Sequence, residues 1–220
     1  MIWLLQARDV PEAALLPYLP RLDAARQQRI ARFRMPHSRV ESCLAGLLLR
    51  YAYRQEYGGP LPALATAQHG KPVFADPAAP AFNLSHWSRE GQYAVACALS
   101  RQPVGADVQG LHRYEEKFRR ILSQSERAWV EESDSDARFT ALWTRKEAYG
   151  KALGCGIGYE MQKTELSGSF EAPTAYEDWL LWTAAADGLF VSVCAKQPLK
   201  LQSVSVEQLL QFAEDRMKLA

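Results

Sequence analysis

Two short segments of this 220-residue chain share one pattern. GQYAVACA starts at Gly91 and GLFVSVCA starts at Gly188, so a glycine, an aromatic residue, a cysteine and an alanine recur at an offset of 97 residues. The same offset maps the apolar helical stretch 44–58 onto a second one at 141–155. A helix-then-strand unit used twice predicts two similar halves, with a cleft between them as the natural site.

The remaining patterns give an α/β (α+β) fold in which each half is a small sheet packed against a long helix. We predict one fused, monomeric unit made of an N-terminal half, 1–102, and a C-terminal half, 103–220. Gly58-Gly59-Pro60 is the stop signal of the long helix in the first half. The predicted elements are helices at 20–35, 38–57, 115–132 and 137–154, strands at 92–100 and 103–109, then alternating strands and a final helix.

Composition excludes several classes of protein. The formal net charge is +1, so no global field attracts nucleic acid or an acidic membrane. The first residues, MIWLLQARDV, lack the basic and long apolar regions of a signal peptide or membrane span, which predicts a cytoplasmic protein. Four cysteines without CxxC spacing are expected to be free thiols rather than a zinc site.

The stretch WTRKEAYGKALG, 143–154, carries the most chemistry. On a helix, Trp143, Glu147 and Lys151 share one face because they are four residues apart. Taken alone, this pattern favours an exposed Glu–Lys pair beside a tryptophan that anchors the core.

Three other segments change that interpretation. Asp107 ends a predicted strand; alone it suggests a turn or cap residue, but beside a carboxylate on a helix it suits Mg²⁺. Ser85 and His86 lie in AFNLSHW, 81–87, whose polar run suits a loop that holds an anion, although a lone histidine is more often structural. Lys71 in HGKPVF is either a solvated loop lysine or a phosphate contact.

Taken in order, GKPVF, FNLSHW, VGADVQ and WTRKEAYGKALG resemble the motif set of the Sfp-type 4′-phosphopantetheinyl transferases of the W/KEA subclass. The family motifs read approximately GKP, FNxSHS, GxDxE and WxxKEAxxKxxG. The matched span runs from about 69 to 154, and the internal repeat fits the family's paired halves.

The resemblance implies an activity. Family members transfer the 4′-phosphopantetheine arm of coenzyme A to a serine of an apo acyl or peptidyl carrier protein and release adenosine 3′,5′-bisphosphate. By similarity, Asp107 and Glu147 hold Mg²⁺, with Mn²⁺ as the alternative, against the CoA pyrophosphate. Glu147 is the candidate base for the carrier serine and Lys151 the phosphate contact. Lys71, Ser85 and His86 bind CoA phosphates, Lys146 lies at the rim, and Trp143 packs behind the metal.

The chain departs from the family pattern in three places. Gln109 replaces a third acidic ligand, and an amide carbonyl is a poorer Mg²⁺ ligand than a carboxylate, so water is the alternative. Arg26 and Arg29 fall near the basic residues that contact CoA in the family, and Arg39 is the candidate for the arginine at the helix start, although its register is shifted and Glu41 lies beside it. Arg26 and Arg39 are therefore weak candidates, and a solvated basic helix is the alternative. Trp87 stands at a small polar position, where it either covers the pocket or packs against the strand.

Two other functions compete with the transferase. The first is a CoA-binding protein that keeps the fold and has lost catalysis, which Gln109 supports and Glu147 with Lys151 opposes. The second is an unrelated Mg²⁺ phosphotransfer enzyme or nuclease, for which the sequence lacks a dense acidic cluster. For the transferase, we expect the carrier's acidic helix to dock on basic residues near the cleft: Arg113, Lys117, Arg119 and Arg120.

Overall fold

Two four-stranded sheets form the centre of the protein in a computed structural model that describes residues 1–155, 160–170 and 172–215. The first sheet has the order β10-β1-β5-β4, with β1 Ile2–Arg8, β4 Ala81–Arg89, β5 Gln92–Ser100 and β10 Leu201–Val204. The second has the order β6-β9-β8-β7, with β6 Val104–Gly110, β7 Thr174–Tyr176, β8 Trp179–Ala186 and β9 Leu189–Ala195. A small hairpin joins β2 Leu64–Thr66 to β3 Pro72–Phe74.

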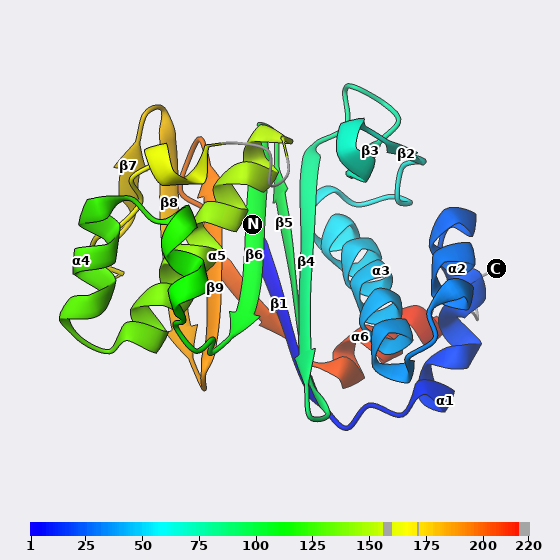
Figure 1. The fold of residues 1–220 in the computed structure, drawn as a ribbon. Helices are drawn as coiled ribbons and strands as arrows, with labels where there is room; N and C mark the ends of the chain where they lie inside the picture. Colours follow the sequence, from blue (N-terminus) through cyan, green and yellow to red (C-terminus); the bar gives the residue numbers. More distant parts are fainter. Residues whose placement is uncertain (156–159, 171, 216–220) are drawn as a thin grey trace.

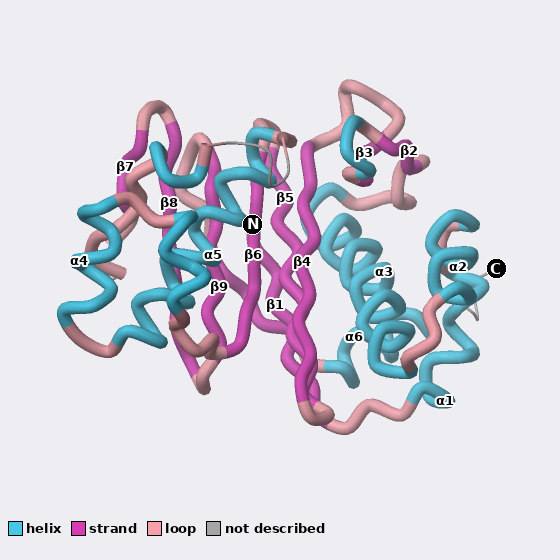
Figure 2. Tube along the Cα trace, in the orientation of Figure 1, coloured by secondary structure: helices cyan, strands magenta, loops and turns pink. Residues whose placement is uncertain are grey.

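A 3-10 helix, a short α-helix and a long α-helix follow one another in both halves, and Figures 1 and 2 show the two long helices on either side of the sheets. The first half has α1 Glu12–Leu15, a 3-10 helix Leu16–Arg21, α2 Ala24–Arg32 and the long α3 Pro36–Tyr57. The second has a 3-10 helix Glu116–Ile121, α4 Gln124–Glu132 and the long α5 Ser135–Leu153. The described residues also form short 3-10 helices at Gln68–Gly70 and Met161–Lys163 and a last helix, α6 Val206–Asp215.

The glycines of the sequence repeat lie at the same place in two hairpins. In the β4–β5 turn, Glu90 and Gly91 have φ of 51° and 76°, and in the β8–β9 turn Asp187 and Gly188 have φ of 53° and 75°. Two positive-φ residues in a two-residue loop are the mark of a type I′ turn, whose twist matches that of paired strands. The recurring glycine is therefore part of the signal that makes each hairpin.

The core is layered as helix, sheet, sheet, helix. Trp3, Leu5 and Val95 face α3 and belong to the cluster that includes Leu44 and Leu48 of that helix. The opposite face of the first sheet, through small residues such as Ala96, packs against the second sheet, whose other face meets α5. The alternation of side chains along each strand produces this arrangement, and the two predicted α/β halves are confirmed.

Three predicted elements differ from those observed. The segment 81–87 is not a loop, because it lies in β4 and is fully paired with β5. The helix predicted at 115–132 is broken, because Ser123 forms a capping box with Glu126 and starts α4 anew. The helix predicted at 20–35 is limited to α2, which begins where the Asp23 side chain accepts a hydrogen bond from the Arg26 backbone NH.

The C-terminal segment returns to the first half. Strand β10 pairs in parallel with β1, and α6 lies against the first core through Leu209. The predicted division at residues 102 and 103 remains a prediction, and residues 216–220, at the end of the predicted second half, lie outside the described part of the chain. Within that part, no helix is long and apolar enough to cross a bilayer, and Cys43, Cys97 and Cys194 are buried in the core.

Candidate active site

The position of α5 over β6 sets the geometry of the site. A Cβ atom on Gly105 of β6 would overlap the carbonyl oxygen of Ala148 in α5, so only glycine allows this close approach. This contact lies next to the candidate site residues of the helix, because Glu147 directly precedes Ala148 and Lys151 follows it by three residues. Gly105 therefore helps to bring both side chains within reach of Asp107, two residues along the strand.

Side chains of β4 connect it to the open edge of β6. The Ala106 backbone NH donates to Asn83 Oδ1 at 2.8 Å, and the Val108 NH donates to Ser85 Oγ at 3.3 Å, with a separation of 23 residues in each pair. The next residue on that face of β4 is Trp87, whose ring fills the space where a Cβ on Gly110 would lie. We call these three pairs the β4–β6 side-chain ladder. It aligns the two halves in one register and answers the open question about Trp87, which packs against the strand.

One solvent-open pocket of about 350 Å³ lies at this junction. Six of the predicted site residues line it, from both halves of the chain, together with Trp143 and Leu84: these are Ser85, His86, Asp107, Gln109, Glu147 and Lys151. Pockets at the junction of two structural units are common ligand sites. Tertiary structure thus gathers residues that lie as much as 66 residues apart in sequence.

Asp107 is the most enclosed polar group of the pocket, with its side chain 1% exposed. Its Oδ1 accepts from Ser85 Oγ at 2.7 Å and from Lys151 Nζ at 2.5 Å. Its Oδ2 accepts from Gln109 Nε2 at 3.2 Å. These donors stabilise the ionised carboxylate in a buried position.

Glu147 has a different environment. Its Oε1 is buried and finds no hydrogen-bond partner among the residues described. Burial raises the pKa of Glu147 above its ordinary value, and the nearby negative charge of Asp107 raises it further, while Lys151 opposes both effects. A buried carboxylate oxygen without a donor is unusual in a native protein, and it marks Glu147 as a candidate functional residue.

The donor set fits a hard divalent cation. Two carboxylates suit Mg²⁺, which usually keeps several waters and binds substrate phosphates as its other ligands. The unpartnered Oε1 of Glu147 is the group that such an ion would satisfy. Within the described ranges no cluster of three or more His, Cys, Asp or Glu side chains is arranged for metal binding.

His86 faces a carboxylate that the sequence analysis did not assign to the site. Its Nδ1 lies 3.5 Å from Oε2 of Glu41 on α3. Burial raises the pKa of Glu41, but hydrogen bonds from His86 and Ser88 outweigh that effect and leave this pKa below its usual range. The sequence signal for Glu41 was its position as an acidic residue in the mostly apolar helical stretch 40–49.

Lys71 lies beside the site rather than in the wall of the main pocket. Its Nζ donates to the backbone carbonyl of Lys151 at 2.5 Å, and it lines a neighbouring pocket of about 290 Å³. Burial, and then the charge of Lys151, lower the pKa of Lys71. Two cations therefore meet at the end of α5, where an anion would be attracted.

Arg26 and Arg39 are outside the pocket. Arg26 is largely buried and donates to the Ser42 carbonyl at 3.2 Å. Arg39 forms a two-pronged ion pair with Glu12 through bonds of 2.6 and 2.8 Å. The structure gives both arginines intramolecular partners in the first half, and their contact with CoA stays a prediction.

The prediction for Lys146 was wrong. It is completely buried instead of lying at the rim, and its Nζ is 2.9 Å from Glu126 Oε1. Trp143 does pack beside the candidate metal site, where it lines the pocket and lies against Phe118 and Phe139.

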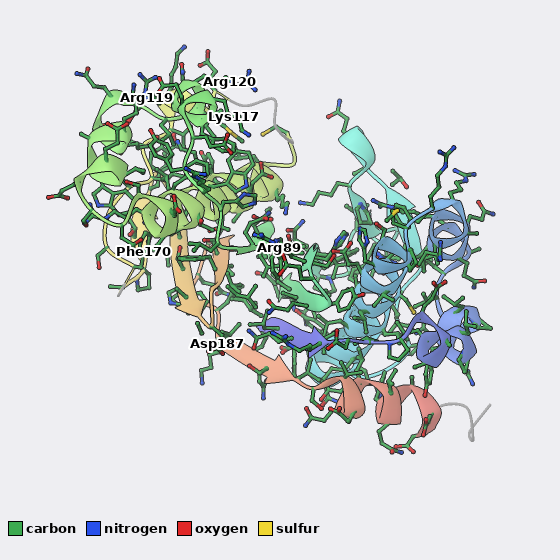
Figure 3. The ribbon with its side chains drawn as sticks, turned by 60° about the horizontal axis from the view of Figure 1, so that its bottom comes forward. Arg89, Lys117, Arg119, Arg120, Phe170 and Asp187 are labelled. Carbon is green, nitrogen blue, oxygen red and sulfur yellow. The ribbon has the colours of Figure 1, made fainter. Side chains whose placement is uncertain are left out.

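The predicted basic docking residues lie between β6 and α4, and Figure 3 shows three of them, Lys117, Arg119 and Arg120, on one segment. Arg119 is committed to Glu131 at 2.8 Å and to Glu116 at 3.0 Å. Arg113 and Arg120 are exposed. These two are the members best placed to meet a partner.

Comparison with known proteins finds relatives that share one activity in their names. Residues 103–185 match the model of the 4′-phosphopantetheinyl transferase superfamily. The chain is 28% identical over 180 residues to a 4′-phosphopantetheinyl transferase (pptA) of Paxillus involutus, covering 71% of this chain and 68% of that protein. It is 27% identical over 199 residues to the 4′-phosphopantetheinyl transferase psf-1 of Bacillus pumilus, covering 80% and 79%. An L-aminoadipate-semialdehyde dehydrogenase-phosphopantetheinyl transferase of Mus musculus is 30% identical over 159 residues, covering 63% of this chain but only 50% of that protein.

Proposed function

Because the chain belongs to the 4′-phosphopantetheinyl transferase superfamily, we propose that it transfers the 4′-phosphopantetheine arm of coenzyme A to a serine of an apo carrier protein. The serine oxygen forms a bond to the phosphorus that carries pantetheine, the bond from that phosphorus to the bridging oxygen breaks, and adenosine 3′,5′-bisphosphate leaves. One observation carries the proposal: Asp107, Glu147 and Lys151 meet in one pocket, and the buried Oε1 of Glu147 has no partner among the described residues.

Asp107 and Glu147 would hold the Mg²⁺ ion, and Mn²⁺ is the alternative. When bound, such an ion neutralises negative charge on the pyrophosphate and polarises its oxygens. Gln109 is a weaker candidate ligand because its Nε2 is already turned toward Asp107 Oδ2. This arrangement favours water at the remaining coordination positions.

Glu147 is the proposed general base for the carrier serine. A general base must lie within hydrogen-bond reach of the proton that it removes, and Glu147 lines the open pocket where the serine would enter. Its two oxygens allow one to face the metal while the other accepts the serine proton, directly or through water. The pocket is open to solvent, which leaves room for the approach of a protein substrate.

The cations of the site bind and stabilise phosphate in this proposal. Lys151 lies at the wall of the pocket, and Lys71 donates to the backbone at the same turn of α5. Ser85 and His86 come from β4 on the opposite side, so CoA phosphates would be held between the two halves.

The carrier is proposed to dock on Arg113, Lys117, Arg119 and Arg120. Lys117 is exposed but paired with Glu115 at 3.2 Å, so Arg113 and Arg120 are replaced by glutamine, which is expected to raise KM for the carrier and leave CoA affinity unchanged. An unchanged KM would remove this surface from the proposal.

Intact-protein mass spectrometry tests the activity. A purified apo acyl carrier protein and an apo peptidyl carrier are incubated with the protein, CoA and Mg²⁺. We expect a gain of one phosphopantetheine, which EDTA and Glu147→Gln abolish, whereas Glu132→Gln on the exposed face of α4 preserves it. No gain with either carrier, together with measurable CoA binding, would favour the second candidate, a CoA-binding protein without transferase activity.

A further inference from the structure

Lys151 holds a position that a metal ion also needs. Its ammonium lies 2.5 Å from Asp107 Oδ1, while the other carboxylate of the site, Glu147, keeps a buried oxygen with no partner in the described structure. Lys151 and Glu147 are one turn apart on the same face of α5, yet the lysine pairs with the strand carboxylate. The protein itself therefore supplies a cation to Asp107.

The surrounding hydrogen bonds complete this arrangement. Ser85 Oγ lies within 3.1 Å of Lys151 Nζ and donates to Asp107 Oδ1 at 2.7 Å, so the hydroxyl connects the two charged groups. Gln109 occupies Oδ2 with a donor rather than with a second negative charge. Asp107, whose side chain is 1% exposed, thus has one positive charge and two neutral donors around it, so the protein pairs this buried carboxylate by itself.

A divalent cation on Asp107 and Glu147 cannot simply be added to this state. It would place two positive charges and an ammonium within a few ångströms of each other, where repulsion is strong at the low effective dielectric of a partly buried site. The Lys151 side chain is 26% exposed and lies at the C-terminal end of α5, so it is free to turn toward the open pocket. The same pocket is where a phosphate would lie.

We propose that Lys151 is the resident counter-ion of Asp107, and that binding of a divalent cation and release of the Lys151 ammonium into the pocket are one coupled step. Lys151 then has two roles. In the metal-free protein it stabilises the assembled site, and after metal binding it becomes available to the phosphate. The inference rests on the proposed metal-dependent function, but it concerns only the free protein.

Mn²⁺ titration followed by electron paramagnetic resonance, without CoA or carrier, tests the coupling. Removing the competing ammonium in Lys151→Met should strengthen Mn²⁺ binding roughly tenfold or more. Lys71→Met is the matched control, because it removes a nearby positive charge that does not pair with Asp107, and it should change the affinity by less than about threefold. Asp107→Asn should abolish binding and so locate the site.

A second measurement observes the lysine directly in the wild-type protein, and Lys151→Met serves only to assign its signal. In ¹⁵N-lysine-labelled protein, the ion-paired Lys151 ammonium should give a protected Nζ signal that Lys151→Met removes, and Mg²⁺ should abolish that protection. Equal Mn²⁺ affinities in wild type, Lys151→Met and Lys71→Met, or an Nζ signal that Mg²⁺ leaves unchanged, would overturn the inference. Failure of carrier modification with this coupling intact would instead count only against the proposed function.

Discussion

The buried ion pair between Lys146 and Glu126 offers the sharpest test of how the site helix is held. Both side chains are 0% exposed, and Lys146 Nζ donates to the carbonyls of Met161 and Thr164 at 2.6 Å as well as approaching Glu126 Oε1 at 2.9 Å. Lys146 adjoins Glu147 in sequence. The pair therefore connects α5, α4 and the segment after α5 directly behind the site.

Lys146→Met removes the ammonium and leaves the Glu126 carboxylate buried, with only the backbone NH groups of Leu166 and Ser123 as the remaining donors that the structure places on it. Loss of one partner of a buried pair costs about 3–5 kcal/mol, a large part of the usual stability of a domain. Burial raises the pKa of Glu126 even with Lys146 present, so the variant can relieve part of this cost by protonation. A raised folded-state pKa favours stability at low pH, and the loss should therefore be greater at pH 8 than at pH 5.

Urea unfolding followed by tryptophan fluorescence measures the effect. With an m-value of about 2 kcal/mol/M, the midpoint should fall by roughly 1.5–2.5 M at unchanged m. The double variant Lys146→Met/Glu126→Leu should recover most of the loss, because an apolar pair replaces a buried charge pair at little cost. Lys163→Met, in an exposed pair with Glu160, should leave the midpoint unchanged. A loss below about 1 kcal/mol, or no recovery in the double variant, would refute the reasoning.

Three further predictions concern the site itself. Gly105→Ala should push α5 away from β6, because the new Cβ overlaps the Ala148 carbonyl. We expect lower activity and a free energy of unfolding in urea that is about 2 kcal/mol or more lower. An unchanged free energy of unfolding would contradict the close approach. Gly110→Ala should be similarly harmful because of the Trp87 ring, and Trp87→Ser in the same chain should restore stability; non-recovery would argue against the ladder. Glu147→Gln should raise the melting temperature of the metal-free protein at pH 7, since the raised pKa of Glu147 makes its ionised form unfavourable in the fold. That gain should vanish below the ordinary carboxyl pKa, and a lower melting temperature at pH 7 would contradict it.

Much of the candidate site could be predicted from local sequence. Glu147 and Lys151 lie on one helix, where a spacing of four fixes a common face whatever surrounds it. Asp107, Ser85 and His86 were assigned by the resemblance of their segments to the family motifs, because an aspartate at the end of a strand is by itself more often a turn or cap residue. The repeat of Gly91 and Gly188 also indicated the two hairpins, because a two-residue type I′ turn needs positive φ and so favours glycine.

Interactions between segments could not be predicted in the same way. Lys146 looked like a rim residue because charge usually stays in water, but its burial is decided by Glu126, 20 residues earlier, and by two carbonyls after the helix. The polar run at 81–87 looked like a loop, since nothing in it reveals that Asn83 supplies a hydrogen bond to the edge of another strand.

The two-fold α/β plan, the hairpins and the set of chemical groups follow from local patterns, because they depend on periodicity, turn geometry and residue type within short windows. The pairing of these groups depends on packing: Lys151 pairs with Asp107 rather than with Glu147, and Gln109 donates to Asp107. The physical reason is that a buried charge takes its partner from whatever the packed chain places within about 3 Å. That choice depends on how α5, β4 and β6 meet, which no local pattern contains.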